Sequence, residues 1–507
     1  MLYAAVTSES PASTQPAPAM SSSAVDLPTS PFGAAWGFLY GYSGVPAISY
    51  WPQLQELGAA FTKVYLFWQQ IEPEKGHFNW SAVEEYVRQL PSPAAGLIAL
   101  FSSSLWATQK PSAMLPPSPA KNVDDYYQFV FELVKRCRGR VRFWQNDCEP
   151  NNPVFWSGTQ EEFVAQSIVF YRAVKDADPD AVVVIGGYDG FFIPPGVTSI
   201  DGSPYKPFAH QSAGLQFFDY VLREAKDAFD LFDLRLYGDP YTIPARVDYI
   251  RRRMQGFGYE KPVICTEYGG PHLFEFAENR KYIDLLSTWS QAVTTADQAG
   301  LPSRDPHSVN QIEKLYSDMS SLAPQTQMFM QGCAPDLEAK YARIQSRSVV
   351  MRNLLGLAND VKAMIYWNLV NIPGPRDELM NLLYGKIGLF NTDRLRVGAR
   401  TLTADVYARM THALNGVRRV QRLNVPGQPA FYVFAVEQEG DRRGFVAWER
   451  RDAFCGSDQP ANPHHWPCRA SDAEAVDLFG NHIPLTLSDG QLQLSVSLDP
   501  VFITLRN

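Results

Sequence analysis

The chain has 507 residues, 45% of them hydrophobic and 19% charged, a composition typical of a folded globular protein and a length that predicts two domains plus a tail. Its net charge of -8 argues against nucleic acid or an anionic membrane surface as the main partner. No run of about 18 apolar residues occurs, so no membrane span is expected.

Residues 1–30 are rich in Ser, Pro, Ala and Thr and show no hydrophobic periodicity, which predicts a disordered tether. No charged stretch followed by an apolar one is visible there, so the sequence shows no intact signal peptide. Tethers of this kind often follow a signal or lipid anchor that has been removed. We therefore expect a secreted or periplasmic protein, with a plain cytoplasmic tail as the alternative.

From residue 31 to residue 414, short apolar runs alternate with segments of helical period, the pattern of repeated βα units. Eight units in this length predict a (β/α)8 TIM barrel, whose catalytic residues come from the carboxyl ends of the strands. A doubly wound sheet is the alternative, but no Gly-rich phosphate loop follows the first strand. The expected strands are Trp36–Tyr40, Lys63–Phe67, Gly96–Phe101, Arg140–Trp144, Ala181–Gly186, Leu231–Tyr237, Pro262–Thr266 and Ala363–Trp367.

The segment 271–345, between the last two of these strands, is longer than one connecting helix requires. On a barrel it would lie on the catalytic face, so we expect it to wall the substrate cleft, with a structural appendage as the alternative. Residues 415–507 show short strands separated by turn signals, which predicts an antiparallel β-sandwich accessory domain. Its expected strands are Phe431–Val436, Gly444–Trp448, Ala475–Leu478, Gln491–Ser495 and Val501–Leu505.

Six cysteines are too few for a disulfide scaffold. Cys148 and Cys265 lie in strand-like runs and are expected to be reduced. Cys455 and Cys468 flank a loop with two histidines, and their spacing matches no familiar zinc pattern. A disulfide that closes this loop and two unrelated thiols both remain open.

Two glutamates each follow an apolar, strand-like run and precede a turn signal. Glu149 stands before Pro150, and Glu267 stands just before Gly269-Gly270. A strand that delivers a carboxylate to the mouth of a fold meets the needs of glycoside hydrolysis, in which one carboxyl protonates the leaving oxygen and the other attacks the anomeric carbon or activates water. The alternative for each is a structural carboxylate in a hydrogen-bond network.

The chain also resembles the glycoside hydrolases of clan A, most closely family 39, over roughly residues 32–507. The motifs occur in the same order along the chain as in that family. They are Phe67–Trp80, Phe101–Trp106, Trp144–Asn151 with Phe155–Thr159, Asp178–Ala181 with Gly186-Gly187, Asp230–Tyr237, Lys261–Glu267, Tyr366-Trp367, and Asp477–Gly480 with Pro500–Ile503.

The resemblance implies a retaining β-glycosidase without cofactor or metal that acts on an oligo- or polysaccharide. It assigns Glu149 as general acid/base and Glu267 as nucleophile, with carboxyls about 5–5.5 Å apart. Tyr237 matches a tyrosine that commonly hydrogen-bonds the nucleophile, and Trp367 matches the aromatic floor of the subsite that holds the cleaved sugar. Core packing is the alternative for both aromatic residues.

Further residues are expected to line the cleft. Four aromatic candidates, each equally compatible with core packing, are Trp68, Trp106, Trp156 and Tyr268. The polar candidates beside the acid/base are Asn146 and Asn151.

Three positions depart from the family pattern. Cys148 stands where an Asn normally binds the sugar 2-hydroxyl, and a thiol is a poor donor. Arg235 stands where a His is usual, and Lys63 replaces an Arg; paired strand-end charges are the alternative for these two. Cys148 leads to the hypothesis that the substrate does not carry an ordinary equatorial hydroxyl at its 2-position, or that this contact matters less.

Two other functional classes share these residues. A non-catalytic barrel that binds glycan is favoured only by Cys148, whereas the retained pair of glutamates argues against it. A transglycosylase would use the same covalent intermediate with a sugar as acceptor. A metal-dependent hydrolase is disfavoured, because no His/Asp/Glu cluster has ligand spacing.

Overall fold

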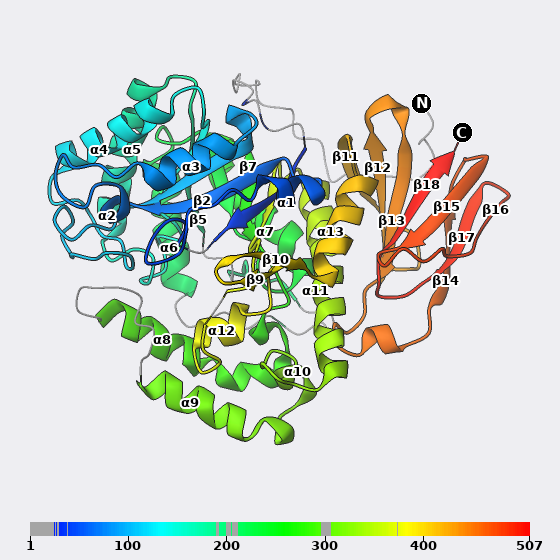
Figure 1. Ribbon diagram of the computed structural model, residues 1–507. Helices are drawn as coiled ribbons and strands as arrows, with labels where there is room; N and C mark the ends of the chain where they lie inside the picture. Colours follow the sequence, from blue (N-terminus) through cyan, green and yellow to red (C-terminus); the bar gives the residue numbers. More distant parts are fainter. Residues whose placement is uncertain are drawn as a thin grey trace.

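The computed structural model describes residues 25, 27, 30–37, 39–188, 192–198, 204, 211–295, 306–372 and 374–506, so the predicted tether lies almost entirely outside the described residues. Eight parallel strands close into a barrel in which β8 pairs with β1 (Figure 1). This confirms the (β/α)8 barrel and excludes the doubly wound sheet. The strands are β1 (Phe32–Trp36), β2 (Phe61–Phe67), β3 (Gly96–Phe101), β4 (Phe143–Asn146), β5 (Val182–Tyr188), β6 (Leu231–Leu234), β7 (Val263–Tyr268) and β8 (Met364–Tyr366).

The first strand was predicted in the wrong place. It ends at Trp36, whereas the sequence pattern placed it at Trp36–Tyr40. Leu39 and Gly41 adopt positive φ, which a strand does not continue through, and Tyr40 is buried in a turn. The apolar pattern therefore continued beyond the strand, because the turn that follows is also packed into the core.

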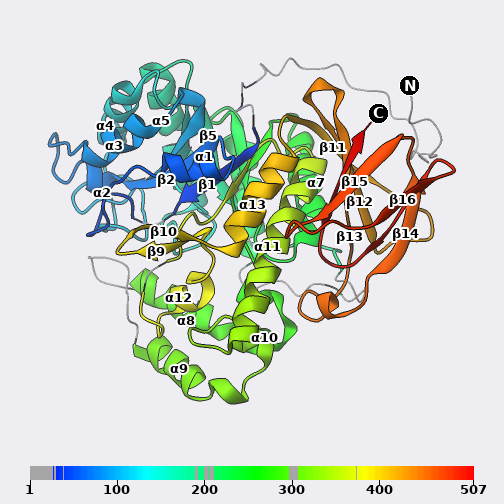
Figure 2. The same ribbon diagram turned by 45° about the vertical axis from the view of Figure 1, so that its right-hand side comes forward.

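Helices alternate with the strands and cover the barrel (Figure 2). Local signals define several of them: at the start of α5, Thr159 and Glu162 form a reciprocal capping box. The helices are α1 (Trp51–Glu56), α2 (Trp68–Ile71), α3 (Ser81–Gln89), α4 (Val123–Cys137), α5 (Gln160–Ala177), α6 (Gln211–Glu224), α7 (Ile243–Gly256), α8 (Asp284–Thr295), α9 (Pro306–Ser317), α10 (Pro324–Gln327), α11 (Pro335–Ala358), α12 (Leu379–Tyr384) and α13 (Leu402–Ala413).

A helical subdomain follows β7 and has its own small core. It includes α8, α9 and α10, and α12 joins it from the segment after β8 (Figure 1). Leu273, Phe274 and Phe276 pack there with Leu379 and Leu382. A two-stranded hairpin, β9 (Phe390–Asp393) and β10 (Arg396–Arg400), follows α12.

The C-terminal region forms two antiparallel sheets, as predicted. One has the order β11-β12-β13-β18-β15 and the other β14-β17-β16. Three of these strands, β11, β14 and β16, were missed because their sequences are largely polar and partly exposed. The bounds are β11 (Val417–Leu423), β12 (Phe431–Gln438), β13 (Arg443–Glu449), β14 (Asn462–Pro467), β15 (Asp472–Asp477), β16 (Leu485–Ser488), β17 (Gln491–Val496) and β18 (Val501–Arg506).

Strand β12 contributes to two cores at once. Phe431, Val433 and Ala435 pack between the sheets of the sandwich, whereas Tyr432 and Phe434 join the core of the barrel. This alternation follows from the two-residue period of a strand. In β13, Trp448 also faces the barrel and donates a hydrogen bond from Nε1 to the Tyr241 hydroxyl at 3.0 Å.

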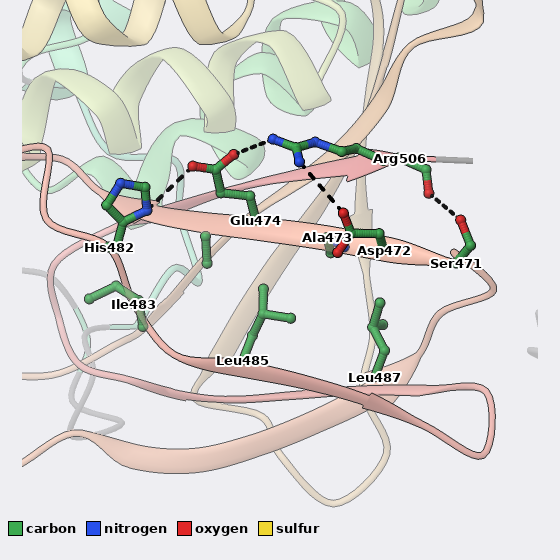
Figure 3. Close-up of a pocket in the computed structure, with 10 residues that line it drawn as sticks. Ser471, Asp472, Ala473, Glu474, His482, Ile483, Leu485, Leu487 and Arg506 are labelled. Atoms are coloured by element: carbon green, nitrogen blue, oxygen red, sulfur yellow. Dashed lines mark hydrogen bonds and ion pairs between the residues drawn. The ribbon is translucent and has the colours of Figure 1, made fainter.

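A shallow groove of about 610 Å³ lies on the sandwich between β15 and β16 (Figure 3). Leu485 and Leu487 form its apolar side, and the charged residues of its rim pair with one another. Arg506 contacts Glu474 at 2.7 Å and Asp472 at 3.6 Å. The described cysteines are all free thiols, Cys455 exposed and Cys468 buried. Within the described residues, no helix is long and apolar enough to cross a bilayer.

Candidate active site

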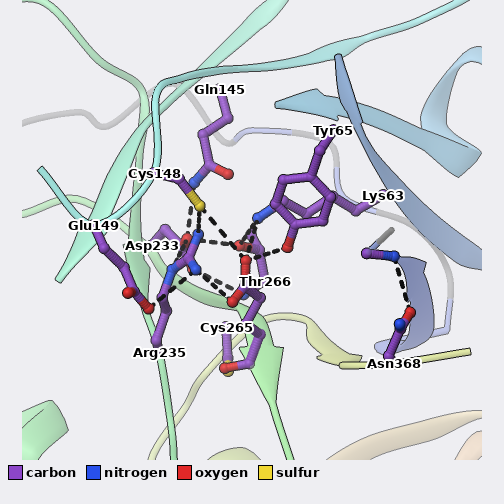
Figure 4. Close-up of polar contacts among 12 residues, drawn as sticks. Lys63, Tyr65, Gln145, Cys148, Glu149, Asp233, Arg235, Cys265, Thr266 and Asn368 are labelled. Carbon is purple, nitrogen blue, oxygen red and sulfur yellow. Dashed lines mark hydrogen bonds and ion pairs between the residues drawn. The ribbon is translucent and has the colours of Figure 1, made fainter. Parts of the chain in front are cut away.

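The two glutamates identified in the sequence meet at the carboxyl ends of the barrel strands. Figure 4 shows Glu149, Arg235 and Cys148 in this cluster. Glu267 is the fifth residue of β7, and Glu149 lies three residues beyond the end of β4. Asp147 and Glu149 adopt φ of 49° and 46°, in the left-handed region that non-glycine residues seldom occupy. Such strain costs about 1–3 kcal/mol per residue and concentrates at functional sites.

Four side chains surround the carboxylate of Glu267. Lys63 Nζ lies 3.2 Å from its Oε1, and the Tyr65 hydroxyl donates to the same oxygen. The Tyr237 hydroxyl donates to Oε2 at 3.2 Å, and Arg235 Nη1 also contacts Oε2. Glu267 is therefore a buried carboxylate with donors on both oxygens.

Arg235 connects the two glutamates. Its Nη1 contacts Glu149 Oε1 at 3.1 Å and Glu267 Oε2 at a shorter distance. Because both carboxylates touch one nitrogen, their nearest oxygens lie less than about twice 3.1 Å apart. Such a close approach of the nearest oxygens is compatible with the about 5–5.5 Å between carboxyl groups in retaining glycosidases.

The environment of Glu267 favours its ionised form. Burial alone would raise the pKa of Glu267, but the charges of Arg235 and Lys63 and the hydrogen bond from Tyr65 outweigh it, so the pKa is lowered. A nucleophilic carboxylate must be ionised when the substrate arrives. The cationic surroundings meet this requirement.

Cys148 lies within the same cluster. Its Sγ is 3.6 Å from Glu267 Oε1, and it accepts a hydrogen bond from Arg235 Nη2. Burial raises the pKa of the Cys148 thiol well above its usual value, so the group is neutral. The position thus offers a weak neutral donor beside the guanidinium of Arg235.

A second layer of polar residues holds Arg235 in place. Asp233 Oδ2 lies 3.5 Å from Arg235 Nε and accepts hydrogen bonds from Gln145 at 2.8 Å and from the Thr266 hydroxyl at 2.6 Å. A Cβ at Gly187 would lie 2.9 Å from Arg235 Nε, so the guanidinium depends on a bare backbone in β5. Arg235 is therefore packed from several strands.

Tyr237 and Trp367 lie beside the glutamates. Their rings form an edge-to-face contact with centroids 6.4 Å apart. A Cβ at Gly37 would come within 1.9 Å of Trp367 Nε1, so the indole lies directly against the backbone that follows β1. The structure thus places Tyr237, Cys148 and Arg235 around Glu267, and Trp367 against Tyr237.

Several other candidates are placed in the packing of the barrel. Trp68 is fully buried, stacks on Phe129 and donates to Glu72 Oε2 at 2.8 Å. Trp106 packs edge-to-face on Trp68. Trp156 is buried against Phe163.

The remaining candidates contact residues of the surrounding helices. Tyr268 is buried on the opposite face of β7 from Glu267, and its hydroxyl accepts from Asn353 of α11 at 2.6 Å. Asn146 accepts from Tyr126 of α4 at 2.9 Å and donates to Ser167 of α5 at 2.9 Å. Asn151 is half-buried and lies beside Gly214 of α6.

Tyr65, Asp233 and Thr266 belong to the site but were not identified from the sequence. The signal was the two-residue period of a strand: Tyr65 follows Lys63 at i+2, and Asp233 precedes Arg235 at i-2, so each pair shares one face. Within the part of the chain that the structure describes, no group of three or more His, Cys, Asp or Glu side chains is arranged to hold a metal ion.

Comparison with known proteins supports the fold. No family model matches the chain, and no curated protein matches its sequence. A family 39 glycoside hydrolase from Bacteroides cellulosilyticus WH2 superposes with a TM-score of 0.58 and 14% identity, over 95% of this chain and 81% of that one. The family 51 α-L-arabinofuranosidase AbfB from Bifidobacterium longum superposes with a TM-score of 0.56 and 10% identity, over 95% of this chain and 96% of that one.

The catalytic domain of the family 30 xylanase C from Talaromyces cellulolyticus gives a TM-score of 0.52 and 12% identity, over 95% of this chain and 99% of that one. All three families belong to clan A, so the predicted resemblance to that clan is confirmed at the level of the fold. Family 39 itself is only weakly indicated, since the three families superpose to a similar extent.

Proposed function

We propose that the protein is a retaining β-glycoside hydrolase that cleaves an oligo- or polysaccharide. One observation carries the proposal: two buried glutamates from different strands contact one guanidinium nitrogen, and the one on β7 is surrounded by cations and hydroxyl donors. The positive φ of Glu149 supports the proposal, because backbone strain of this kind is concentrated at functional sites.

In the first step, the carboxylate of Glu267 attacks the anomeric carbon, and Glu149 gives its proton to the departing glycosidic oxygen. The product is a covalent glycosyl-enzyme. In the second step, Glu149 takes a proton from water, the water oxygen attacks the anomeric carbon, and Glu267 leaves as a carboxylate. Both glutamates return to their starting states.

The neighbouring residues support these roles. Lys63, Tyr65 and Tyr237 hold the carboxylate of Glu267 in one orientation, which lowers the cost of reaching the reactive geometry. Arg235 stabilises Glu267 as an anion before the attack. When substrate enters, we expect the contact of Arg235 with Glu149 to be exchanged for the contact of Glu149 with the glycosidic oxygen.

The structural neighbours do not identify the sugar, since they include a xylanase and an α-L-arabinofuranosidase. We therefore propose a carbohydrate substrate without naming the monosaccharide. A secreted or periplasmic location remains a proposal that rests on the composition of residues 1–30.

The test is hydrolysis of a panel of aryl β-glycosides and of plant and bacterial β-glycans by the wild type and the Glu267→Gln variant. We expect product release by the wild type and a loss of at least about 10³-fold in the variant. Glu278→Gln, an exposed glutamate beyond β7, is the matched control and should retain full activity. A Glu267→Gln variant as active as the wild type would refute the assignment.

Cys148 favours one second candidate function, a barrel that binds glycan without cleaving it. Glycan binding without hydrolysis of any member of the panel would support that function. A transglycosylase would instead release the aglycone and transfer the glycosyl group to an added sugar acceptor, which product analysis detects.

A further inference from the structure

An aromatic corner lies beside the glutamates and contains residues from four separate segments. Trp367 follows β8 and Tyr237 follows β6, while His272 begins the helical subdomain and Tyr384 ends α12. The Tyr384 ring meets Trp367 at 4.9 Å between centroids and at 84°, and it meets Tyr237 at 6.4 Å. Tyr384 and Trp367 are therefore arranged as a wall and a floor at nearly a right angle.

Tyr384 differs from the other three rings in its exposure. Trp367 is 9% exposed, Tyr237 5% and His272 2%, whereas Tyr384 is half-buried. Tyr384 therefore keeps part of its surface open to solvent next to the residue proposed as the sugar floor. Aromatic faces and edges at such positions contact the C–H groups of a sugar through apolar area.

The position of Tyr384 is fixed by the subdomain behind it. Leu379, Leu382 and Leu383 of α12 are buried in the core of that subdomain, so the end of α12 is anchored. On its other side, the Tyr384 ring lies 5.5 Å from that of His272. The wall is consequently held from two directions.

The start of the subdomain is tied to the barrel by a buried ion pair. Arg352 of α11 contacts Glu275 Oε1 at 2.9 Å and donates to the carbonyl of Leu236, the neighbour of Tyr237, at 2.9 Å. The same Glu275 oxygen accepts from the backbone N–H of His272 at 3.0 Å. The subdomain and the end of β6 are thus linked through one arginine.

We propose that Tyr384 is a specificity-determining residue whose ring walls the sugar lying on Trp367 and limits the size of sugar that the site accepts. The proposal rests on the proposed glycosidase function. It predicts that loss of the Tyr384 ring, which stands at 84° to the Trp367 indole with centroids 4.9 Å apart, enlarges the room for an exocyclic hydroxymethyl group on that sugar. It also gives the helical subdomain a role in selectivity.

The test compares 4-nitrophenyl β-D-xylopyranoside with 4-nitrophenyl β-D-glucopyranoside, which differ only in that hydroxymethyl group. In the Tyr384→Ala variant, the ratio of kcat/KM for glucoside over xyloside should rise about 10-fold, the size of effect that one or two methylenes have in a pocket. In Tyr384→Phe, the same ratio should stay within about twofold of the wild type, because the ring and not its hydroxyl forms the wall.

Two further variants separate selectivity from damage to the fold. Tyr282→Ala removes a partly buried ring of the same subdomain that has no contact with Trp367 among the described interactions, and it should leave the ratio unchanged. Tyr384→Leu keeps an apolar contact with the subdomain while it removes the aromatic plane, so it should also raise the ratio. The proposal is overturned if, in both Tyr384→Ala and Tyr384→Leu, the ratio of kcat/KM for glucoside over xyloside stays within twofold of the wild type or falls.

Binding provides an arm that does not depend on catalysis. Xylohexaose and cellohexaose are titrated into Glu267→Gln with and without Tyr384→Ala, and the ratio of the two Kd values should shift in the same direction. A shift in the Kd ratio without any hydrolysis by the wild type would support the role of Tyr384 and refute the proposed glycosidase function. Hydrolysis without a change in either ratio would refute the wall alone, and absence of both binding and hydrolysis would count against both.

Discussion

One arginine at the barrel mouth and one on the sandwich each contact more than one carboxylate. Arg235 lies between Glu149 and Glu267 with its side chain 1% exposed, and Arg506 lies between Asp472 and Glu474 with its side chain 61% exposed. The contacts are similar, and at the buried site the charges of Arg235 and Lys63 hold the pKa of the Glu267 carboxyl below its usual value. Burial, rather than pairing, distinguishes the site that can carry chemistry.

The largest difference between the Arg235 and Arg506 clusters is expected in kcat. Glu267→Gln keeps the size of the side chain but removes its charge, so kcat should fall by at least about 10³-fold, corresponding to about 4 kcal/mol of transition-state stabilisation. Glu474→Gln, the matching change beside Arg506, should leave kcat unchanged. Initial rates on the best aryl glycoside measure both; equal losses would show that the two clusters are not functionally distinct.

The next effect is on stability. Arg235→Met removes the guanidinium from a cluster of buried carboxylates, leaves Glu267 with Lys63 as its cationic partner, and should lower the free energy of unfolding by about 3–5 kcal/mol. Arg506→Met breaks exposed pairs, which are worth about 0–1 kcal/mol. Urea titration followed by circular dichroism measures the difference. If both variants unfold at the wild-type midpoint, burial does not govern the strength of the pairing.

The pH dependence gives a third contrast. Because the folded pKa of Glu267 is lowered, its contribution to stability is present above the unfolded value of about 4.3 and is lost as the pH falls through the folded pKa. The acidic limb of the kcat/KM profile should therefore lie below about pH 4.3. Arg235→Lys, which retains a cation but not the fork of donors, should move this limb to higher pH, whereas Arg506→Lys should not. An unmoved limb would contradict the role of Arg235.

The smallest effect is expected at Cys148. Cys148→Asn replaces a neutral thiol with an amide that both donates and accepts hydrogen bonds. If this position selects the substituent at carbon 2 of the sugar, the variant should gain about 10-fold in kcat/KM on ordinary β-glucosides or xylosides, an effect of one hydrogen bond. Cys455→Asn, at an exposed site, is the suitable control. Cys265→Asn is unsuitable, because Cys265 is fully buried in β7. No change in activity would dismiss the hypothesis.

Sequence reasoning was confirmed for the barrel, where the signal was local. Glu149 and Glu267 end apolar runs before turn signals, and the eight βα units follow from periodicity alone. It failed where the signal is long-range: Tyr384 reaches Trp367 only because α12 packs on a subdomain that begins more than a hundred residues earlier in the chain. The sequence also proposed Trp68 and Trp156 for the cleft, but both rings pack against phenylalanines of the core. A tryptophan near a motif is therefore not in itself a signal for substrate binding.

The shared strand β12 has a consequence for how this protein can be divided. Phe434 faces the barrel while Val433, its neighbour, faces the sandwich, so neither core is complete without the same strand. A chain cut at residue 414 would leave open the barrel surface that Phe434 and Trp448 cover. We therefore expect the C-terminal region to melt together with the barrel in a single transition, rather than to behave as an independent module.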